Sequence, residues 1–303
     1  MNLDPDLAAV LSTAEPLPPH RAGDWKSWRD TVAAMYPAIT AGLPPANVDR
    51  KVFTTTTGDG HDLELHWFVP VGGLTGAALV HAHGGGLVAG QVEHFAPFIA
   101  RHVEASGVPV LSVEYRLAPE SRTLTDDVYA GLTWLIANAA ELGVDPARIA
   151  VWGESAGATL AAGTAVRARD EGLPLARQIL VYPLLDNQEL EPDPHLLPFA
   201  ADLYPLKTTA WRAVLGDDHA GDAPATVVPA RLRDFRGLAP AYLEVGALDP
   251  LREETIDWAR RLWAAGVDAE LQVLPGLIHG WDHFAPGLRP DVIERRIAVM
   301  RSL

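Results

Sequence analysis

A serine lies in a pentapeptide whose small neighbours could expose its hydroxyl. Ser155 is the third residue of Gly153-Glu154-Ser155-Ala156-Gly157. Small residues on both sides allow a sharp strand-to-helix turn that holds the Oγ atom clear of a sheet. The apolar run 148–152 predicts the strand, and the small-residue stretch 155–168 predicts the closely packed helix. This context predicts that Ser155 is a nucleophile for acyl transfer, most simply ester hydrolysis.

A glycine run lies upstream of this serine. Gly84, Gly85 and Gly86 follow His83, after an apolar stretch that predicts a strand. Main-chain N–H groups of glycine can approach a developing oxyanion because no Cβ is in the way. A flexible turn after a strand is the plainer interpretation of the same place. Because Ser155 is present, we favour an oxyanion hole.

Two strands downstream each lead into a residue that could complete the chemistry. Asp249 follows the apolar run 241–245, and His279 follows the run 269–274. Sites in open α/β sheets form at the carboxyl ends of strands. The chain order of serine, acid and histidine is one of the orders known for such triads. We therefore predict that Asp249 and His279 meet Ser155.

Other polar residues are weaker candidates for this role. His81 lies on the strand before the glycine run and is expected to be a structural histidine with its own hydrogen bonds. Asp282 is too near His279 in sequence to be the natural group to orient it. Asp257 falls within a predicted helix, where a solvated charge is the simpler interpretation.

Six segments now allow a family comparison. The chain resembles bacterial members of the hormone-sensitive-lipase family of α/β-hydrolase esterases. The matching segments, in the family's order, are 81–86, 113–120, 153–157, 182–186, 246–252 and 275–281. They span most of the chain, so the resemblance is specific.

The resemblance implies a role for each matched residue. Ser155 would be the nucleophile, His279 the general base and then the general acid, and Asp249 the group that orients the histidine. The implied oxyanion hole comprises Gly84, Gly85, Gly86 and Ala156, with N–H donors from Gly85, Gly86 and Ala156. Glu120 matches a position that supports the site without taking part in the chemistry.

The chain also departs from the family pattern. Leu87 stands where an aromatic residue usually follows the glycine run, so we expect it to alter the wall of the substrate pocket. Glu154 precedes the nucleophile where the family usually has Asp or Thr. Ala158 and Thr159 replace a glycine-asparagine pair, and the stretch 120–127 lacks a common proline. We expect these changes to affect substrate preference and not the reaction class.

The pattern of apolar runs predicts an α/β fold. Strands alternate with helices from residue 77, which predicts a mostly parallel central sheet with helices on both faces. A hairpin is expected over 51–69. Expected strands are 77–82, 108–115, 148–152, 177–182, 241–245 and 269–274, and expected helices lie near 94–105, 126–142, 155–170, 251–265 and 290–302. This is the α/β-hydrolase architecture.

Two segments interrupt the alternation and predict a helical cap. We assign 46–186 and 232–303 to the catalytic domain, and 1–45 and 187–231 to the cap. Within the first cap segment, four apolar residues recur at helical spacing. They are Trp25, Trp28, Val32 and Met35. A packing stripe and a lid over the acyl pocket explain this spacing equally well.

Composition limits the other function classes. The 303 residues carry a net charge of −15, which argues against nucleic-acid partners and anionic membranes. There is no cysteine, which fits a reducing cytoplasm and excludes thiol chemistry. No apolar run approaches a membrane span and no signal peptide is visible, so we expect a cytoplasmic protein. The resemblance also allows a homodimer, although no residue pattern demonstrates one.

The predicted reaction uses a small-molecule ester and needs no metal or other cofactor. We expect short-to-medium acyl chains, because a cap should enclose a finite pocket. An amidase, a lactonase or an acyltransferase could use the same triad, so these alternatives stay open. A non-catalytic ligand-binding module on the same fold is the alternative from another class. Such modules typically lack a triad residue, and this chain has all three.

Overall fold

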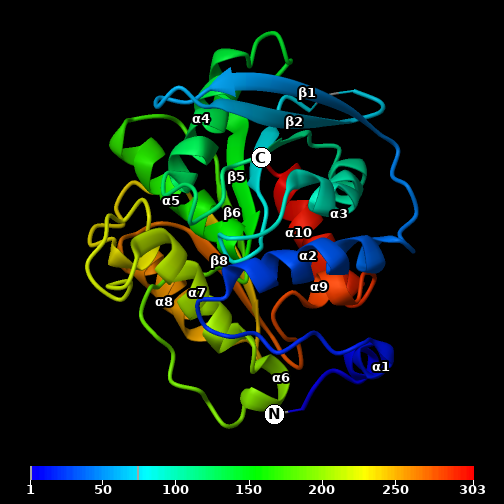
Figure 1. The fold of residues 1–303 in the computed structure, drawn as a ribbon. Helices are drawn as coiled ribbons and strands as arrows, with labels where there is room; N and C mark the ends of the chain where they lie inside the picture. Colours follow the sequence, from blue (N-terminus) through cyan, green and yellow to red (C-terminus); the bar gives the residue numbers. More distant parts are fainter. Residues whose placement is uncertain (1, 74) are drawn as a thin grey trace.

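A single eight-stranded sheet forms the centre of the molecule (Figure 1). The computed structural model describes residues 2–73 and 75–303. The strand order is β1-β2-β4-β3-β5-β6-β7-β8, with β1, β2 and β4 paired antiparallel and the other neighbours paired parallel. The strands are β1 (Val48–Thr56), β2 (Asp62–Pro70), β3 (Ala78–Ala82), β4 (Val110–Val113), β5 (Ile149–Glu154), β6 (Gln178–Val181), β7 (Ala241–Gly246) and β8 (Ala269–Leu274). The predicted α/β-hydrolase fold is confirmed.

Helices cover both faces of the sheet. One face carries α3 (Val92–Ser106) and α10 (Pro290–Arg301), and the other carries α4 (Leu124–Ala137), α5 (Ala156–Asp170) and α8 (Arg252–Ala264). Shorter elements join them: α9 (Trp281–Phe284) and the 3-10 turns Pro146–Arg148 and Pro229–Arg231. Because both faces are covered, the central parallel strands can be apolar along their whole length.

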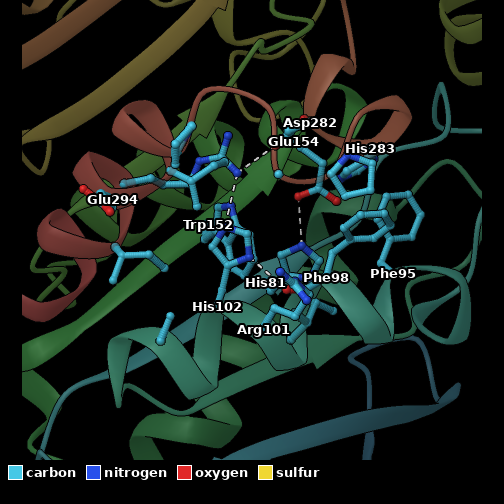
Figure 2. Close-up of a pocket in the computed structure, with 18 residues that line it drawn as sticks. His81, Phe95, Phe98, Arg101, His102, Trp152, Glu154, Asp282, His283 and Glu294 are labelled. Carbon is cyan, nitrogen blue, oxygen red and sulfur yellow. Dashed lines mark hydrogen bonds and ion pairs between the residues drawn. The ribbon is translucent and has the colours of Figure 1, made fainter. Parts of the chain in front are cut away.

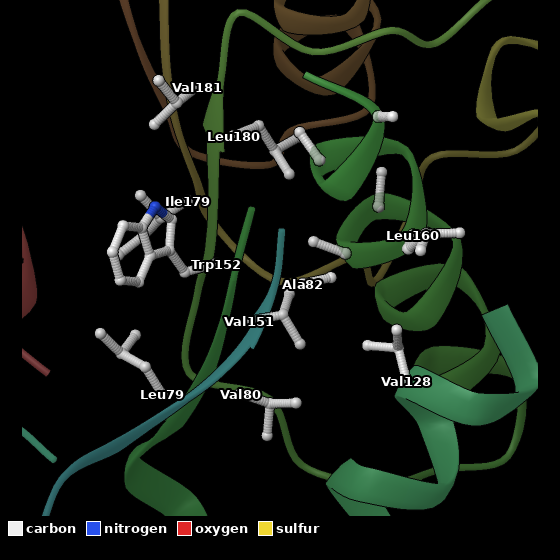
Figure 3. Packing of buried hydrophobic residues seen from close by; sticks show 14 of the residues in the cluster. Leu79, Val80, Ala82, Val128, Val151, Trp152, Leu160, Ile179, Leu180 and Val181 are labelled. Atoms are coloured by element: carbon white, nitrogen blue, oxygen red, sulfur yellow. The ribbon is translucent and has the colours of Figure 1, made fainter. Parts of the chain in front are cut away.

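Side chains alternate between the two faces along β5. Figure 3 shows Val151 on the face of α5, near Leu160, and Trp152 on the opposite face. All residues of β3, β5 and β7 are buried. Since alternate residues share a face, Glu154 lies on the same face as Trp152. This places the last side chain of β5 under α3 and α10, away from α5.

The predicted hairpin forms β1 and β2. The turn between them is closed by main-chain hydrogen bonds from Thr57 N to His61 O at 2.8 Å and from Gly60 N to Thr57 O at 2.9 Å. Gly60 has a φ of 86°, a conformation that favours glycine. The hairpin extends the sheet beyond β4 and lies far from the carboxyl ends of β7 and β8 (Figure 1).

The two segments that interrupt the alternation lie against each other. The first contains α1 (Pro5–Thr13) and α2 (Trp25–Thr40), and the second contains α6 (Leu197–Ala200) and α7 (Leu203–Leu215). His20 Nε2 and the Gly23 amide each lie 2.8 Å from Thr209 Oγ1, and the His20 amide donates to Asp202 Oδ1 at 3.1 Å. Segments distant in sequence therefore form one helical layer over the sheet's carboxyl edge.

The length and apolar character of each helix decide whether it could cross a membrane. No helix among the described residues is both long and apolar enough to cross a bilayer.

Candidate active site

The turn between β5 and α5 holds Ser155 in a rare backbone conformation. Its φ is 55°, which an L-residue adopts at a cost of about 1–3 kcal/mol. A Cβ added to Gly153 would lie 2.4 Å from the Gly157 carbonyl, and one added to Gly157 would lie 1.9 Å from Ala82 O. Only glycine fits both positions. The two glycines of the pentapeptide therefore let α5 pack directly against β3 and β5 while the serine stays partly exposed.

Three predicted side chains form one chain of hydrogen bonds. Nε2 of His279 lies 2.8 Å from Ser155 Oγ, and Nδ1 of the same ring lies 2.8 Å from Asp249 Oδ2. The Asp249 side chain is fully buried, and its other oxygen accepts the Leu251 N–H at 2.8 Å. The histidine side chain is 18% exposed. The loops after β7 and β8 thus bring the carboxylate and the imidazole to the hydroxyl on the turn after β5.

A tyrosine supports the histidine from the side. The Tyr182 ring packs edge-on against His279, with ring centroids 4.8 Å apart. Its hydroxyl donates to Asp282 Oδ1 at 2.8 Å, and Arg296 Nη1 donates to the other oxygen at 2.9 Å. Burial alone would raise the pKa of Asp282, but Arg296, together with His283 and the Tyr182 hydroxyl, holds that pKa well below its usual range. Asp282 therefore acts on Tyr182 and not on His279 directly.

The glycine loop after β3 adopts conformations that other residues avoid. Gly85 has a φ of 123° and Gly86 a φ of 67°, and a Cβ on Gly85 would lie 2.1 Å from Ala89 O. Among the described residues, the N–H groups of Gly85, Gly86 and Ala156 have no acceptor. They are free to serve an incoming oxyanion.

Gly84 behaves differently from its two neighbours. Its N–H donates to Glu154 Oε1 at 3.1 Å, so it is not available to an oxyanion. Gly84 therefore belongs to the loop of the predicted hole without offering an N–H group to it, and the predicted N–H donors remain Gly85, Gly86 and Ala156.

The helices over the sheet edge contact this loop. Trp28 Nε1 on α2 donates to Gly85 O at 3.3 Å, and a Cβ on Gly86 would lie 3.1 Å from Leu206 of α7. Leu87 is buried with a φ of 63°, and its carbonyl accepts the Ala118 amide at 3.0 Å. Leu87, the residue predicted to line the substrate pocket, thus comes directly after the loop that contacts α2 and α7, and it is buried.

Comparisons with known proteins identify the family of this chain. A family model described as the alpha/beta hydrolase fold matches residues 79–283. The chain is 31% identical to ethyl acetate hydrolase of Pseudomonas putida, with 92% of both chains covered. It is 39% identical to carboxylesterase NlhH of Mycobacterium tuberculosis over 68% of this chain and 67% of the relative. A solved bacterial heroin esterase superposes with a TM-score of 0.87 at 36% identity, covering 99% of this chain and 96% of that one.

The chain belongs to the hormone-sensitive-lipase family of α/β-hydrolase carboxylesterases. The predicted enzyme class, a carboxylic ester hydrolase, is confirmed at the level of this family.

Glu120, which follows β4 in the chain, is hydrogen-bonded to Arg29 of α2. Its carboxylate accepts two hydrogen bonds from Arg29, at 2.6 and 2.9 Å. Arg29 also donates to Val88 O at 2.6 Å and to Ala118 O at 3.0 Å. The hydrogen bond from Arg29 lowers the pKa of Glu120. This residue therefore fastens α2 beside the glycine loop, and no local pattern indicated its arginine partner.

A cavity of about 240 Å³ lies behind the nucleophile turn. Figure 2 shows it between α3, α10 and the loop around α9, with Trp152, Glu154, His283 and Phe98 in its wall. Burial lowers the pKa of His102, another wall residue, to about 4. The cavity is separate from the exposed face of Ser155, which it does not include among its lining residues.

The remaining sequence candidates have other partners. His81 contacts Ser112 Oγ at 2.9 Å and Glu154 Oε2 at 3.0 Å. The Asp257 side chain is about half exposed, and its Oδ1 lies 3.5 Å from Arg260 Nη1 on the same helix. Among residues 2–73 and 75–303, no group of three or more His, Cys, Asp or Glu side chains is placed to hold a metal ion.

Proposed function

We propose that the esterase hydrolyses carboxylic esters through a Ser155-His279-Asp249 triad and an acyl-enzyme intermediate. The observation that carries the proposal is the continuous hydrogen-bond chain through both ring nitrogens of His279, at 2.8 Å on each side. Removing the nucleophile is the direct test. Ser155→Ala should fold and show no ester hydrolysis above background, whereas activity equal to wild type would refute the proposal.

The first half of the reaction acylates the serine. Ser155 Oγ attacks the ester carbonyl carbon while its proton passes to His279 Nε2, and Asp249 stabilises the imidazolium. The carbonyl oxygen becomes an oxyanion that accepts hydrogen bonds from the N–H groups of Gly85, Gly86 and Ala156. The tetrahedral intermediate then collapses, the C–O bond to the alcohol breaks, and His279 protonates the leaving alkoxide.

The second half releases the acid. A water molecule gives a proton to His279 and attacks the acyl carbon, and the same N–H groups hold the new oxyanion. When the bond to Ser155 breaks, the serine oxygen recovers its proton from His279. The enzyme returns to its starting state, and the products are an alcohol and a carboxylic acid.

We propose short-to-medium acyl chains as the preferred substrates. The closeness of Leu206 and Trp28 to the glycine loop supports a limited space over the site. A relative named ethyl acetate hydrolase is consistent with small esters. Rates on p-nitrophenyl esters from acetate to palmitate test this. Fastest turnover on acetate to octanoate is expected, and fastest turnover on palmitate would contradict it.

The division into two units remains part of the proposal. Residues 46–186 and 232–303 would form the catalytic unit, and 1–45 with 187–231 the cap. The hydrogen bonds of His20 and Gly23 to Thr209 support a cap built from both segments.

The same triad is compatible with other reactions. An amidase or a lactonase would cleave an amide or a lactone bond, and an acyltransferase would pass the acyl group to an acceptor other than water. One acyl group presented as ester, amide and lactone would distinguish these activities.

A further inference from the structure

We propose that Glu154 is a positioning residue that fastens the glycine loop to the nucleophile turn. The proposal rests on the proposed function, because it concerns the alignment of the oxyanion donors with Ser155. Glu154 does not touch the substrate. It acts through Gly84, whose N–H group it occupies.

Both oxygens of this carboxylate are engaged. Oε1 accepts the Gly84 N–H at 3.1 Å, and Oε2 lies 3.0 Å from His81 Nε2 (Figure 2). The other ring nitrogen of His81 lies 2.9 Å from Ser112 Oγ. All of these side chains are buried, and the Glu154 residue is only 4% exposed. A hydrogen-bonded path therefore runs from β4 through β3 to the end of β5, and returns to the glycine loop.

The charge of Glu154 strengthens these bonds. Burial alone would raise the pKa of Glu154, but His81, with smaller contributions from His283 and His83, lowers that pKa below its usual value. The carboxylate is therefore ionised near neutral pH. Hydrogen bonds to an ionised acceptor are roughly twice as strong as neutral ones. The bond to Gly84 is thus well suited to fix a loop that has little side-chain packing of its own.

Glu154 directly precedes Ser155 in the chain, so it connects the nucleophile to the glycine loop without an intermediary. The backbone of Glu154 leads into Ser155, while its side chain holds the residue before Gly85 and Gly86. A Cβ on Gly84 would lie 3.2 Å from Glu154 O and 3.5 Å from Ser155 Cβ, so the two segments already touch. One residue therefore sets the spacing between the nucleophile and the oxyanion donors.

The other contacts of the loop hold carbonyl groups. Tyr115 Oη donates to His83 O at 2.7 Å, and His83 Nδ1 lies 2.7 Å from Gly84 O. Neither engages the Gly84 N–H group. Without the carboxylate, the peptide between His83 and Gly84 loses the side chain that accepts its N–H group.

Kinetics of Glu154 variants test the proposal. Glu154→Ala should lower kcat about 100-fold with little change in KM, the size expected when reacting groups are displaced by about 1 Å. Glu154→Gln keeps an acceptor for Gly84 and should lose less than about tenfold. A trifluoromethyl ketone, which forms an oxyanion when Ser155 adds to it, should lose affinity in parallel with kcat. Folding is monitored by circular dichroism and thermal unfolding.

Matched variants separate positioning from general stability. Asp127 is a fully buried carboxylate that accepts the Arg116 N–H at 2.9 Å and pairs with the same arginine. Asp127→Asn should lower the unfolding temperature while kcat stays close to wild type. Glu154→Met retains side-chain volume without an acceptor, so it replaces the alanine variant if that protein does not fold. It should lose as much kcat as predicted for alanine.

The outcomes decide the proposal clearly. Folded Glu154→Ala or Glu154→Met with wild-type kcat and ketone affinity would overturn it, as would Glu154→Gln losing as much as these variants. Ser155→Ala measured in the same assay tests the triad separately. If that variant is inactive while the Glu154 variants are fully active, the positioning role fails and the proposed function stands.

Discussion

The hydroxyl of Tyr182 donates to Asp282 Oδ1 at 2.8 Å, and the same tyrosine ring packs against His279. Tyr182 has a φ of 36°, so its backbone is held in a conformation that L-residues rarely adopt. The loop that carries His279 therefore contacts a tyrosine tied to the following helix. This relationship connects the orientation of the imidazole to a buried ion pair between Asp282 and Arg296.

Removing this hydroxyl should weaken the support of the histidine. Tyr182→Phe leaves a buried carboxylate with one donor fewer, at a cost of about 1–3 kcal/mol in the free energy of unfolding. We expect kcat to fall because Tyr182, which packs against His279, is no longer tied to Asp282. We expect KM to change less, because the Phe ring still fills the space beside His279. Denaturant unfolding and steady-state kinetics on one ester check both effects. An unchanged free energy of unfolding would show that the bond contributes nothing.

Asp249→Asn tests the carboxylate of the proposed triad. The amide oxygen can still accept the Leu251 N–H, so the loop should keep its shape. The variant cannot stabilise the imidazolium and favours the wrong tautomer, so kcat should fall about 10,000-fold. Kinetics with an intact circular dichroism spectrum measure this. A variant as active as wild type would mean that another acid orients His279.

Gly85→Ala tests the oxyanion hole. The new Cβ would lie 2.1 Å from Ala89 O, and the residue has a φ of 123°, so the loop must shift. Loss of one oxyanion donor typically lowers kcat about 100- to 1,000-fold, and we expect a loss of at least this size. Gly107→Ala is a suitable control, because that glycine also has a positive φ but meets nothing within 4 Å. Equal losses of kcat in both variants would argue against a specific role of the loop.

Acid should destabilise the protein through buried histidines. Burial, together with the charge of Arg296, lowers the pKa of His102 to about 4 in the folded state. The unfolded chain, with a histidine pKa of about 6.5, binds this proton first, so stability falls as pH falls from 6.5 to 4. Each such histidine contributes a slope of about 1.4 kcal/mol per pH unit in this window.

His102→Gln should remove one proton from this dependence. Glutamine can donate to Phe98 O and accept from Arg296, as His102 does. Unfolding by denaturant at several pH values between 4 and 7 gives the slope. The exposed His195→Gln variant serves as control and should keep the wild-type slope. If both variants share one slope, His102 is not a source of acid sensitivity.

The strands, and the positions of the three residues of the proposed triad at strand ends, could be predicted because their signals are local. Apolar runs, turn residues and chain order place Ser155, Asp249 and His279 without knowledge of long-range contacts. The hairpin over β1 and β2 follows from alternation and its glycine turn in the same way. Elements of this kind are decided by neighbours in sequence, and the structure agrees with them.

The support of the site was not predictable, because it depends on distant partners. Nothing local shows that Arg296, in the last helix, pairs with Asp282 and Glu244 in the core. The interaction of Arg29 with Glu120 is equally invisible. Glu154 stood out only as an unusual neighbour of the nucleophile, and nothing in the sequence pointed to its hydrogen bond with the Gly84 N–H group.

The most direct measurement of the central claim is covalent labelling by a fluorophosphonate. An activated serine attacks the phosphorus, fluoride leaves, and the adduct resembles the tetrahedral intermediate. We predict one adduct per chain, located by mass spectrometry on Ser155, with loss of esterase activity in proportion to labelling and no adduct in Ser155→Ala. An active enzyme that remains unlabelled, or carries its adduct on another residue, would contradict the account.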